Sequence, residues 1–270
     1  MTDPIIFDRR QVRRQRDRAA RTIAAHDFLL RECALRLLDR LEDVTRKFPL
    51  ALDLGCHDGG LAAGLKGRFG IERLIAADLS PAMAGLAGAA DLAVAADEET
   101  LPFAEGRFDL VVSNLSLHWV NDLPGALLQI RRILKPDGLF LATMLGGETL
   151  RELRQCLLEA ELAEEGGAGP RVSPFVEVRD AGALLQRAGF ALPVADIDDV
   201  AVTYGNPFTL LSDLRGMGET NALAARRRSF SRRGTIGRAM ALYHERYADP
   251  EGRMPATFQV VTLTGWSPVR

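Results

Sequence analysis

Three aspartates follow short apolar stretches of the sequence, and the first stands beside a glycine-rich turn. Asp53 lies within LALDLGCHDGG at 50–60, Asp78 within RLIAADLS at 73–80, and Asp97 within LAVAADEE at 92–99. A glycine turn between a strand and a helix lets a ligand approach the backbone closely and presents free N–H groups. An acid about 20 residues beyond such a turn is placed to accept hydrogen bonds from ribose hydroxyls. One strand further on, Asp97 is predicted to reach an adenine amino group.

The negative charge of these side chains restricts the ligand. Taken alone, the turn GCHDGG aligns with either GxGxG or GxGxxG, and only the second pattern indicates a dinucleotide whose pyrophosphate lies on a helix N-terminus. Asp53, two residues before Gly55, would repel a pyrophosphate and attract a cation. The three carboxylates therefore predict a positively charged ligand that carries ribose and adenine but no phosphate. S-adenosylmethionine is such a ligand.

Alternating strand and helix patterns position the three aspartates. Apolar runs without alternation are typical of strands that are covered on both faces of a parallel sheet. Such runs predict five strands, at 50–56, 73–80, 92–99, 108–120 with its exit loop, and 139–145. Helical spacing predicts helices at 60–69, at 81–89 behind Ser80 and Pro81, and at 123–134, followed by a KPDG turn. This order is typical of βαβ units with right-handed crossovers.

The alternation weakens after Met144. Helices are predicted at 147–165 and 177–190, strands at 193–205 and 256–266, and a helical, basic segment at 206–249 between those strands. One or two further helices are predicted before the first strand. Two late strands without full βαβ spacing indicate an antiparallel addition at the sheet edge. We therefore expect an α/β fold with a mostly parallel seven-stranded sheet, helices on both faces and an antiparallel C-terminal strand.

Composition excludes several classes of protein. A formal net charge of -2 over 270 residues argues against a nucleic-acid protein that relies on a positive field over its whole surface. Three widely separated cysteines (Cys33, Cys56 and Cys156) predict neither a disulfide framework nor a zinc site, and the histidines show no metal-binding spacing. We expect no metal, no membrane span and no targeting signal at the N-terminus. Abundant arginine and alanine with scarce lysine favour a GC-rich bacterial source, and the cysteines favour its cytoplasm.

Several motifs together resemble the class I S-adenosylmethionine-dependent methyltransferases over about 50–145. The motifs are LDLGCHDGG, AADLS, AADEETLPFAEGRFDLVVSNLSLHWV and ILKPDGLF. The resemblance implies a Rossmann-like fold with a helical cap at 1–48 and a methyltransferase domain at 49–270. The core of that domain would be 49–145, with a helical insertion at about 205–250.

The same resemblance implies the roles of individual residues. It places the methionine part of the cofactor on Asp53, Gly55 and Gly59, and Asn114 under the sulfonium. It places the ribose on Asp78 and the adenine on Asp97 and Glu98. His57 and Leu79 are the remaining residues predicted to bind the cofactor. His57 stands where the family has a middle glycine. If the backbone needs a positive φ there, a histidine is costly, which affects the affinity for the cofactor.

A narrower resemblance runs nearly from end to end of the chain. The sequence is similar to the mitochondrial complex I assembly factors with a methyltransferase fold and their bacterial relatives, and more distantly to the malonyl carrier-protein O-methyltransferases. The motifs that carry it are IFDR, FPLALDLGC, NLSLHWVNDLP, GGETLRELR, SPF, LLQRAGF, DLRGMGETN and PATFQV. The first family is credited with hydroxylating an arginine of a complex I subunit, and the second methylates a carboxylate. The fold does not choose between these chemistries.

Three functions remain open at the level of sequence. The first is a methyltransferase that positions an acceptor in line with the cofactor, with His118 as a general base or, alternatively, as a histidine packed under Trp119. The second is an arginine hydroxylase, and the third a non-enzymatic assembly factor. The corresponding partners are a protein client, such as a complex I subunit, or an acyl carrier protein.

Two arginine clusters allow more than one interpretation. One is N-terminal and the other lies near 226–233. The N-terminal cluster is either a solvated helix face, a contact for an acidic partner or a lid over the cofactor, and the second cluster is either solvated or faces an acyl carrier or another protein. Their members are Arg9, Arg10, Arg13, Arg14, Arg16, Arg18 and Arg21, and then Arg226, Arg227, Arg228, Arg232 and Arg233.

Overall fold

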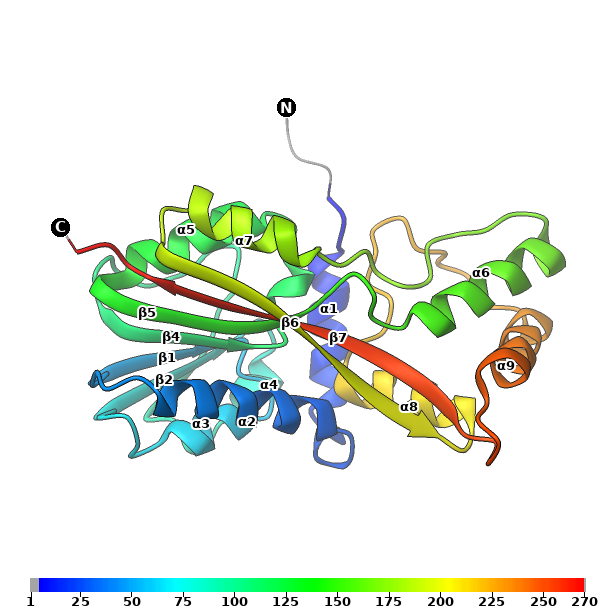
Figure 1. Ribbon diagram of the computed structural model, residues 1–270, viewed down its shortest axis with the longest axis horizontal. Helices are drawn as coiled ribbons and strands as arrows, with labels where there is room; N and C mark the ends of the chain where they lie inside the picture. The colour runs from blue at the N-terminus through cyan, green and yellow to red at the C-terminus, as the bar shows by residue number, and fades with distance from the viewer. Residues whose placement is uncertain (1–4, 270) are drawn as a thin grey trace.

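A computed structural model describes residues 5–269 and builds them around one seven-stranded sheet (Figure 1). The strands are β1 (Leu50–Leu54), β2 (Arg73–Asp78), β3 (Leu92–Ala95), β4 (Phe108–Asn114), β5 (Leu134–Leu145), β6 (Ala191–Tyr204) and β7 (Met254–Trp266). Their order in space is β3-β2-β1-β4-β5-β7-β6. Strand β7 runs antiparallel to both of its neighbours, β5 and β6, and all other neighbouring strands are parallel to each other. The predicted mostly parallel sheet with an antiparallel C-terminal strand is confirmed.

Helices cover both faces of this sheet, as the alternating pattern predicted. The helices are α1 (Arg9–Ala19), α2 (Phe28–Glu42), α3 (Gly60–Leu65), α4 (Pro81–Ala84), α5 (Leu123–Ile133), α6 (Arg151–Glu165), α7 (Val178–Arg187), α8 (Pro207–Met217) and α9 (Arg233–Tyr247), with short 3-10 turns η1 (Ile23–Ala25) and η2 (Leu117–Trp119). One apolar cluster joins α2 and α3 to the sheet, and a second joins α5 and α7 to its opposite face. No helix among residues 5–269 combines the length and the apolar character that crossing a bilayer requires.

The strand order produces a switch point beside β1. The chain passes from β1 to β2 and β3 on one side, then returns to place β4 on the other side of β1. Asp53 of β1 is therefore in register with Ala76 of β2 and with Val112 of β4. Ligands of open α/β sheets bind at the carboxyl ends of the strands at such a point.

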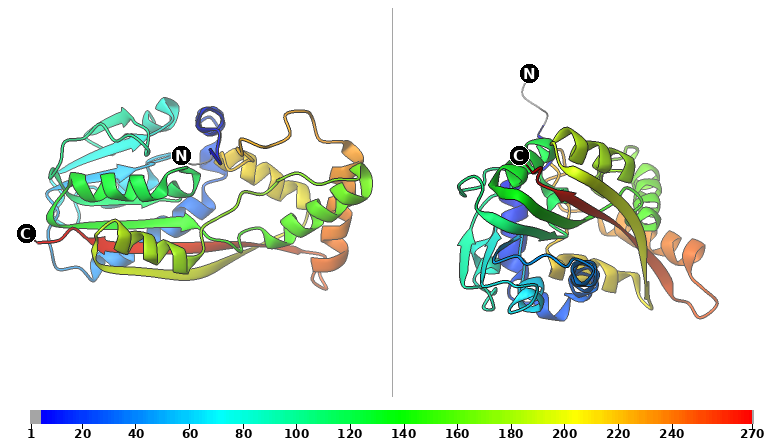
Figure 2. Two further views of the ribbon diagram at one scale, coloured as in Figure 1. Left: turned by 90° about the horizontal axis from the view of Figure 1, so that it is seen from above. Right: turned by 60° about the vertical axis from the view of Figure 1, so that its left-hand side comes forward.

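The last two strands extend the sheet well beyond its parallel core. The outer halves of β6 and β7 pack against α6, α8 and α9 (Figure 1), and Figure 2 shows this extension as an elongated second end of the molecule. A third apolar cluster, which includes Tyr243 and Phe258, fills it. The division into a cap at 1–48 and a methyltransferase domain at 49–270 stays a prediction, and residues 1–4 and 270 of these ranges lie outside the described part of the chain.

Some local expectations were wrong. Residues 218–232, which we expected to be helical, form a loop between α8 and α9. Helix α3 ends at Leu65 rather than near residue 69, because Gly67 takes a φ of 73° and Phe69 a φ of 54°. The KPDG turn is an irregular start of β5, where Asp137 hydrogen-bonds to Ser267 beyond β7. Helix α4 begins as predicted, with the Ser80 hydroxyl accepting from the backbone N–H of Met83 at 3.1 Å, but it ends after four residues.

Candidate functional site

The predicted acids gather at the carboxyl ends of β1, β2 and β3. Asp53 and Asp78 are fully buried within the ends of β1 and β2, and Glu98 is fully buried directly after β3. Asp97, its neighbour, is partly exposed. Because the three strands are parallel, their ends meet at one edge of the sheet and bring these carboxyl groups into one site.

The glycine turn after β1 requires glycine at two positions for different reasons. Gly59 has a φ of 78°, and a Cβ there would lie 2.6 Å from the Cα atom of Ala87. Gly55 has a φ of 72°, and a Cβ there would lie 2.1 Å from the hydroxyl oxygen of Ser116. The turn therefore packs closely against the segment between α4 and β3 and against the loop after β4, which leaves no room for a side chain.

The backbone of His57 has a φ of 48°, the positive value that is costly for a histidine. Its backbone N–H donates to Asp78 at 3.1 Å. Its ring Nε2 lies 3.1 Å from the carbonyl oxygens of Asn114 and Leu115, so Nε2 carries the proton and donates. Burial, and then the charge of Arg16, lower the pKa of His57, so the ring is neutral.

Asp53 differs from the other acids because it has no partner. Both carboxylate oxygens are buried, and neither has a hydrogen-bond partner among the described residues. Burial, with a smaller contribution from Asp78, raises the pKa of Asp53 to about 8. Unsatisfied buried carboxyl groups are rare in folded proteins, and they often mark a functional site.

Two arginines of α1 form ion pairs with the remaining acids of the site. The Arg16 guanidinium lies 3.3 Å from Asp78 and 3.1 Å from Glu98, and it donates to the Ser116 hydroxyl at 2.8 Å. Arg9 pairs with Asp97 at 2.6 Å and also contacts Glu98. Burial alone would raise the pKa of Glu98, but Arg16 and then Arg9 reverse this effect and lower the pKa to about 2.

Asn114 and Leu79 lie at the site, and both contact neighbouring elements of the fold. The Asn114 side chain donates to the Leu30 carbonyl at 2.9 Å and accepts from the Thr143 hydroxyl at 2.8 Å, which ties α2 to β4 and β5. Leu79 packs against an apolar cluster that includes Val12 of α1 and Trp119.

His118 lies in η2, apart from the acids. Its Nε2 lies 3.0 Å from the Glu219 carboxylate, which also accepts from the indole N–H of Trp119 at 3.0 Å. The Nδ1 atom of His118 is buried and has no hydrogen-bond partner within 5–269. Burial would raise the pKa of Glu219, but the contacts with His118 and Trp119 outweigh it, and the pKa is lowered. The two expectations for His118, a base or a residue packed beside Trp119, remain compatible with this geometry.

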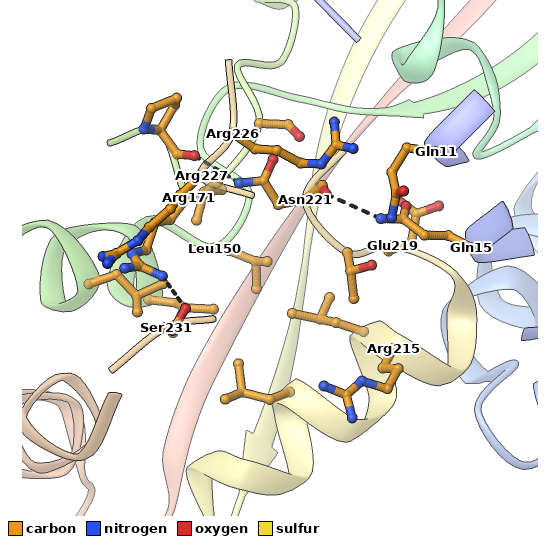
Figure 3. A pocket seen from close by; sticks show the side chains of 18 of the residues that line it. Gln11, Gln15, Leu150, Arg171, Arg215, Glu219, Asn221, Arg226, Arg227 and Ser231 are labelled. Carbon is orange, nitrogen blue, oxygen red and sulfur yellow. Dashed lines mark hydrogen bonds between the residues drawn. The ribbon is translucent and has the colours of Figure 1, made fainter. Parts of the chain in front are cut away.

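A cavity of about 560 Å³ lies beside this site, between α1 and the extension (Figure 3). Gln11 and Gln15 of α1 form one wall, and Figure 3 shows Arg171 and Arg227 on the opposite side. The apolar part of the lining includes Leu150 of the β5–α6 connection. Trp119 and Glu219 also line the cavity, whereas the acids at the ends of β1, β2 and β3 do not.

Two residues of this site, Ser116 and Glu219, were not identified from the sequence. Arg9 and Arg16 were named only as members of the N-terminal arginine cluster, for which a lid over the cofactor was one interpretation. The two arginines had a detectable signal, because they are seven residues apart and lie on the same face of α1 as buried Val12. Ser116 and Glu219 had none, since their partners are distant along the chain.

Comparison with known proteins first defines the class. Residues 52–142 match the family model described as a methyltransferase domain. Among solved structures, the YcgJ protein from Bacillus subtilis aligns with a TM-score of 0.61 at 14% identity, covering 87% of this chain and 100% of that one. A putative methyltransferase bound to the Haloferax volcanii Trm112 activator aligns with a TM-score of 0.59 at 20% identity, covering 96% of this chain and 98% of that one. The fold is that of a methyltransferase domain.

Closer relatives define the family. The chain is 46% identical to the arginine-hydroxylase NDUFAF5, mitochondrial, of Danio rerio, over 97% of this chain and 83% of that protein. The human protein of the same name is 47% identical over 97% of this chain and 76% of its own length. The chain belongs to this NDUFAF5 family. A malonyl-[acyl-carrier protein] O-methyltransferase of Methylovorus sp. is 35% identical over 98% of this chain and 91% of its own length.

Proposed function

We propose that the protein binds S-adenosylmethionine at the acidic edge of β1, β2 and β3 and catalyses transfer of its methyl group to an acceptor in the adjoining cavity. The observation that carries this proposal is the buried, unpartnered carboxyl group of Asp53 beside a turn that excludes side chains. The membership of the chain in a family with a methyltransferase domain supports it.

The residues present fit such a cofactor. Asp78 and Glu98 already accept hydrogen bonds from N–H groups of Arg16, so their carboxylates are placed to accept from the ribose hydroxyls and the adenine amino group. Asp53 offers two free acceptors. We assign the methionine part to Asp53, Gly55, His57 and Gly59, the ribose to Asp78 and Leu79, the adenine to Asp97 and Glu98, and the neighbourhood of the sulfonium to Asn114.

The cofactor, when bound, supplies an activated methyl group, so the protein contributes mainly position. Asp53 stabilises positive charge at the turn, and the glycine turn admits the ligand close to the backbone. Since Glu219 accepts from Nε2 of His118, the lone pair of His118 lies on Nδ1. Nδ1 is therefore the atom that takes a proton from an acceptor that carries one. An acceptor that is already a carboxylate needs no such base.

The cavity favours an acceptor that carries negative charge. Arg171, Arg215, Arg226 and Arg227 line it, against the acidic side chains of Glu161 and Glu219. The relatives named malonyl-[acyl-carrier protein] O-methyltransferase support an acyl group on a carrier protein as the acceptor and the carrier as the partner. The three described cysteines are free and buried, which supports a reducing compartment such as a bacterial cytoplasm.

Calorimetry with S-adenosylmethionine tests cofactor binding directly. We expect wild-type protein to bind and Asp53→Ala to bind at least tenfold more weakly, while Asp43→Ala, which removes an exposed acid at the C-terminal end of α2, leaves the affinity unchanged. Absence of binding by the wild-type protein at millimolar cofactor contradicts the proposal.

Incubation with methyl-labelled cofactor and cell extract tests the transfer. We expect label in a protein or carrier-bound product. His118→Asn should lower the rate if the acceptor carries a proton, and should leave the rate unchanged if the acceptor is a carboxylate. Cofactor binding without transfer of label to any product argues against methyl transfer.

A second candidate is hydroxylation of an arginine in a protein client, the complex I subunit that the family resemblance implies. The relatives of 45–47% identity that are named arginine hydroxylase favour it. Mass spectrometry of the bacterial counterpart of that subunit, from wild-type and deletion strains, tests it. A mass increase of one oxygen that disappears in the deletion strain supports hydroxylation, and equal masses in the two strains contradict it.

A further inference from the structure

Helix α1 places only two of its arginines in the site. Its buried residues are Val12, Gln15, Arg16 and Ala19. Arg16 is 1% exposed, whereas Arg10, Arg13, Arg14 and Arg18 on the same helix are exposed. Burying an arginine is costly unless charged partners satisfy it. The contacts with Asp78, Glu98 and Ser116 provide this compensation inside the site proposed for the cofactor.

Arg9 and Arg16 use the same oxygen atoms that a cofactor would need. Both oxygens of Asp78 lie within 3.4 Å of Arg16, and Glu98 is shared between Arg16 and Arg9. Asp97 accepts from Arg9. None of these acids lines the large cavity, because α1 closes the edge of the sheet above them. A nucleoside and the docked α1 cannot hold these carboxylates at the same time.

We propose that α1 is an internal competitor of S-adenosylmethionine: in its docked position it closes the cofactor site through Arg9 and Arg16, and cofactor binding displaces it. This inference rests on the proposed function. It assigns to the N-terminal arginines a role in which they occupy the carboxylates that would hold the ribose and the adenine, rather than cover a bound cofactor.

The contacts of α1 extend this competition to the cavity. Phe7 forms a β-bridge with Leu223, and the Asp8 carboxylate pairs with Arg226 at 3.0 Å. Gln15 donates to the Asn221 carbonyl at 3.1 Å. These partners belong to the loop 218–232, which supplies Asn221, Arg226 and Arg227 to the cavity lining. Displacement of α1 therefore moves one wall of the cavity, so that cofactor entry and acceptor access are coupled.

The wild-type protein allows a direct test by hydrogen–deuterium exchange and limited trypsin digestion. With saturating S-adenosylmethionine we expect faster amide exchange across 9–19 and faster cleavage at its arginines, while exchange in α9 is unchanged. Slower exchange, or no change, in α1 when calorimetry shows that the cofactor is bound overturns the competition and makes α1 a lid or a bystander.

Variants of single arginines in α1 test whether these side chains weaken the binding of the cofactor. Arg16→Gln should lower the Kd for S-adenosylmethionine at least tenfold, and Arg13→Gln, an exposed arginine of the same helix, should leave it unchanged. Arg9→Gln replaces Arg16→Gln if the latter does not fold, with the same expected direction. Unchanged or weaker binding in both Arg9 and Arg16 variants overturns the competition while leaving the proposed cofactor in place. Absence of binding by wild type and every variant overturns the proposed function and the competition together.

Discussion

At the scale of single residues, two buried carboxyl groups of the same site titrate in opposite directions. Asp53 and Glu98 are both fully buried, and burial raises the pKa of each. Two arginines reach Glu98 and reverse the effect, so its pKa falls to about 2. No cation among the described residues pairs with Asp53, and its pKa rises to about 8. At neutral pH the carboxyl group of Asp53 is therefore mainly protonated, and a bound cation would favour its ionised form.

This difference predicts that cofactor binding depends on pH. Because a cation favours ionised Asp53, binding at pH 7 releases a proton, and the affinity should rise by up to about tenfold for each pH unit from pH 6 to pH 8, then level off. Calorimetry in buffers of different ionisation enthalpy measures the released proton. Asp53→Asn should abolish both the proton release and the pH dependence. An affinity that does not change from pH 6 to pH 8 is incompatible with this role of Asp53.

The raised pKa of Asp53 also makes the free energy of unfolding depend on pH. The folded pKa of Asp53, about 8, lies above the ordinary value of 3.8, so the folded state binds the proton more tightly. The resulting stability is fully present below pH 3.8 and is lost as the pH rises to about 8. Asp53→Asn should therefore increase the free energy of unfolding at pH 8 relative to the wild type, and chemical denaturation at pH 5 and pH 8 measures the difference.

At the scale of elements, the turn between β1 and α3 packs against the segment that joins α4 to β3. Gly59 combines a φ of 78° with a position where a Cβ would meet the backbone of Ala87. Gly237 in α9 is the opposite case, since it is exposed within a helix and a Cβ there would meet nothing within 4 Å. The same chemical change thus has opposite expected effects at the two positions.

Gly59→Ala should destabilise the protein by about 2 kcal/mol or more, because a left-handed backbone costs an alanine about 1–2 kcal/mol and the overlap with Ala87 adds to it. Gly237→Ala should stabilise it by about 1 kcal/mol, the helix propensity difference. Urea denaturation at constant pH measures both. Equal effects at the two positions would contradict the close packing of the turn.

At the scale of the whole molecule, the three free cysteines lie in two separate apolar clusters. Cys33 and Cys156 lie in the apolar cluster of the extension, and Cys56 lies behind the glycine turn. Burial raises the pKa of Cys33 to about 12 and that of Cys156 to about 11, and it also raises the pKa of Cys56. Since only thiolates react as nucleophiles, none of the three is expected to react in the folded protein.

A thiol reagent therefore measures the cooperativity of the fold. We expect no rapid labelling of native protein at pH 8 and labelling of all three cysteines in guanidinium. Rapid labelling of Cys56 alone would show local opening of the glycine turn, and rapid labelling of Cys33 and Cys156 alone would show that the extension opens independently of the core. Either result contradicts a single cooperative unit.

The sequence by itself determined the class of fold, the order of its elements and the acids at the strand ends. These features depend on local periodicity, because an apolar run such as 50–54 can only be buried on both faces, and parallel strands bring their carboxyl ends to one edge. The tertiary structure alone decided which arginines of α1 turn inward, that Asn114 ties helices to strands, and that Glu219 meets His118. Those contacts join residues separated by up to 101 positions, and the docking of whole elements selects them rather than any local pattern.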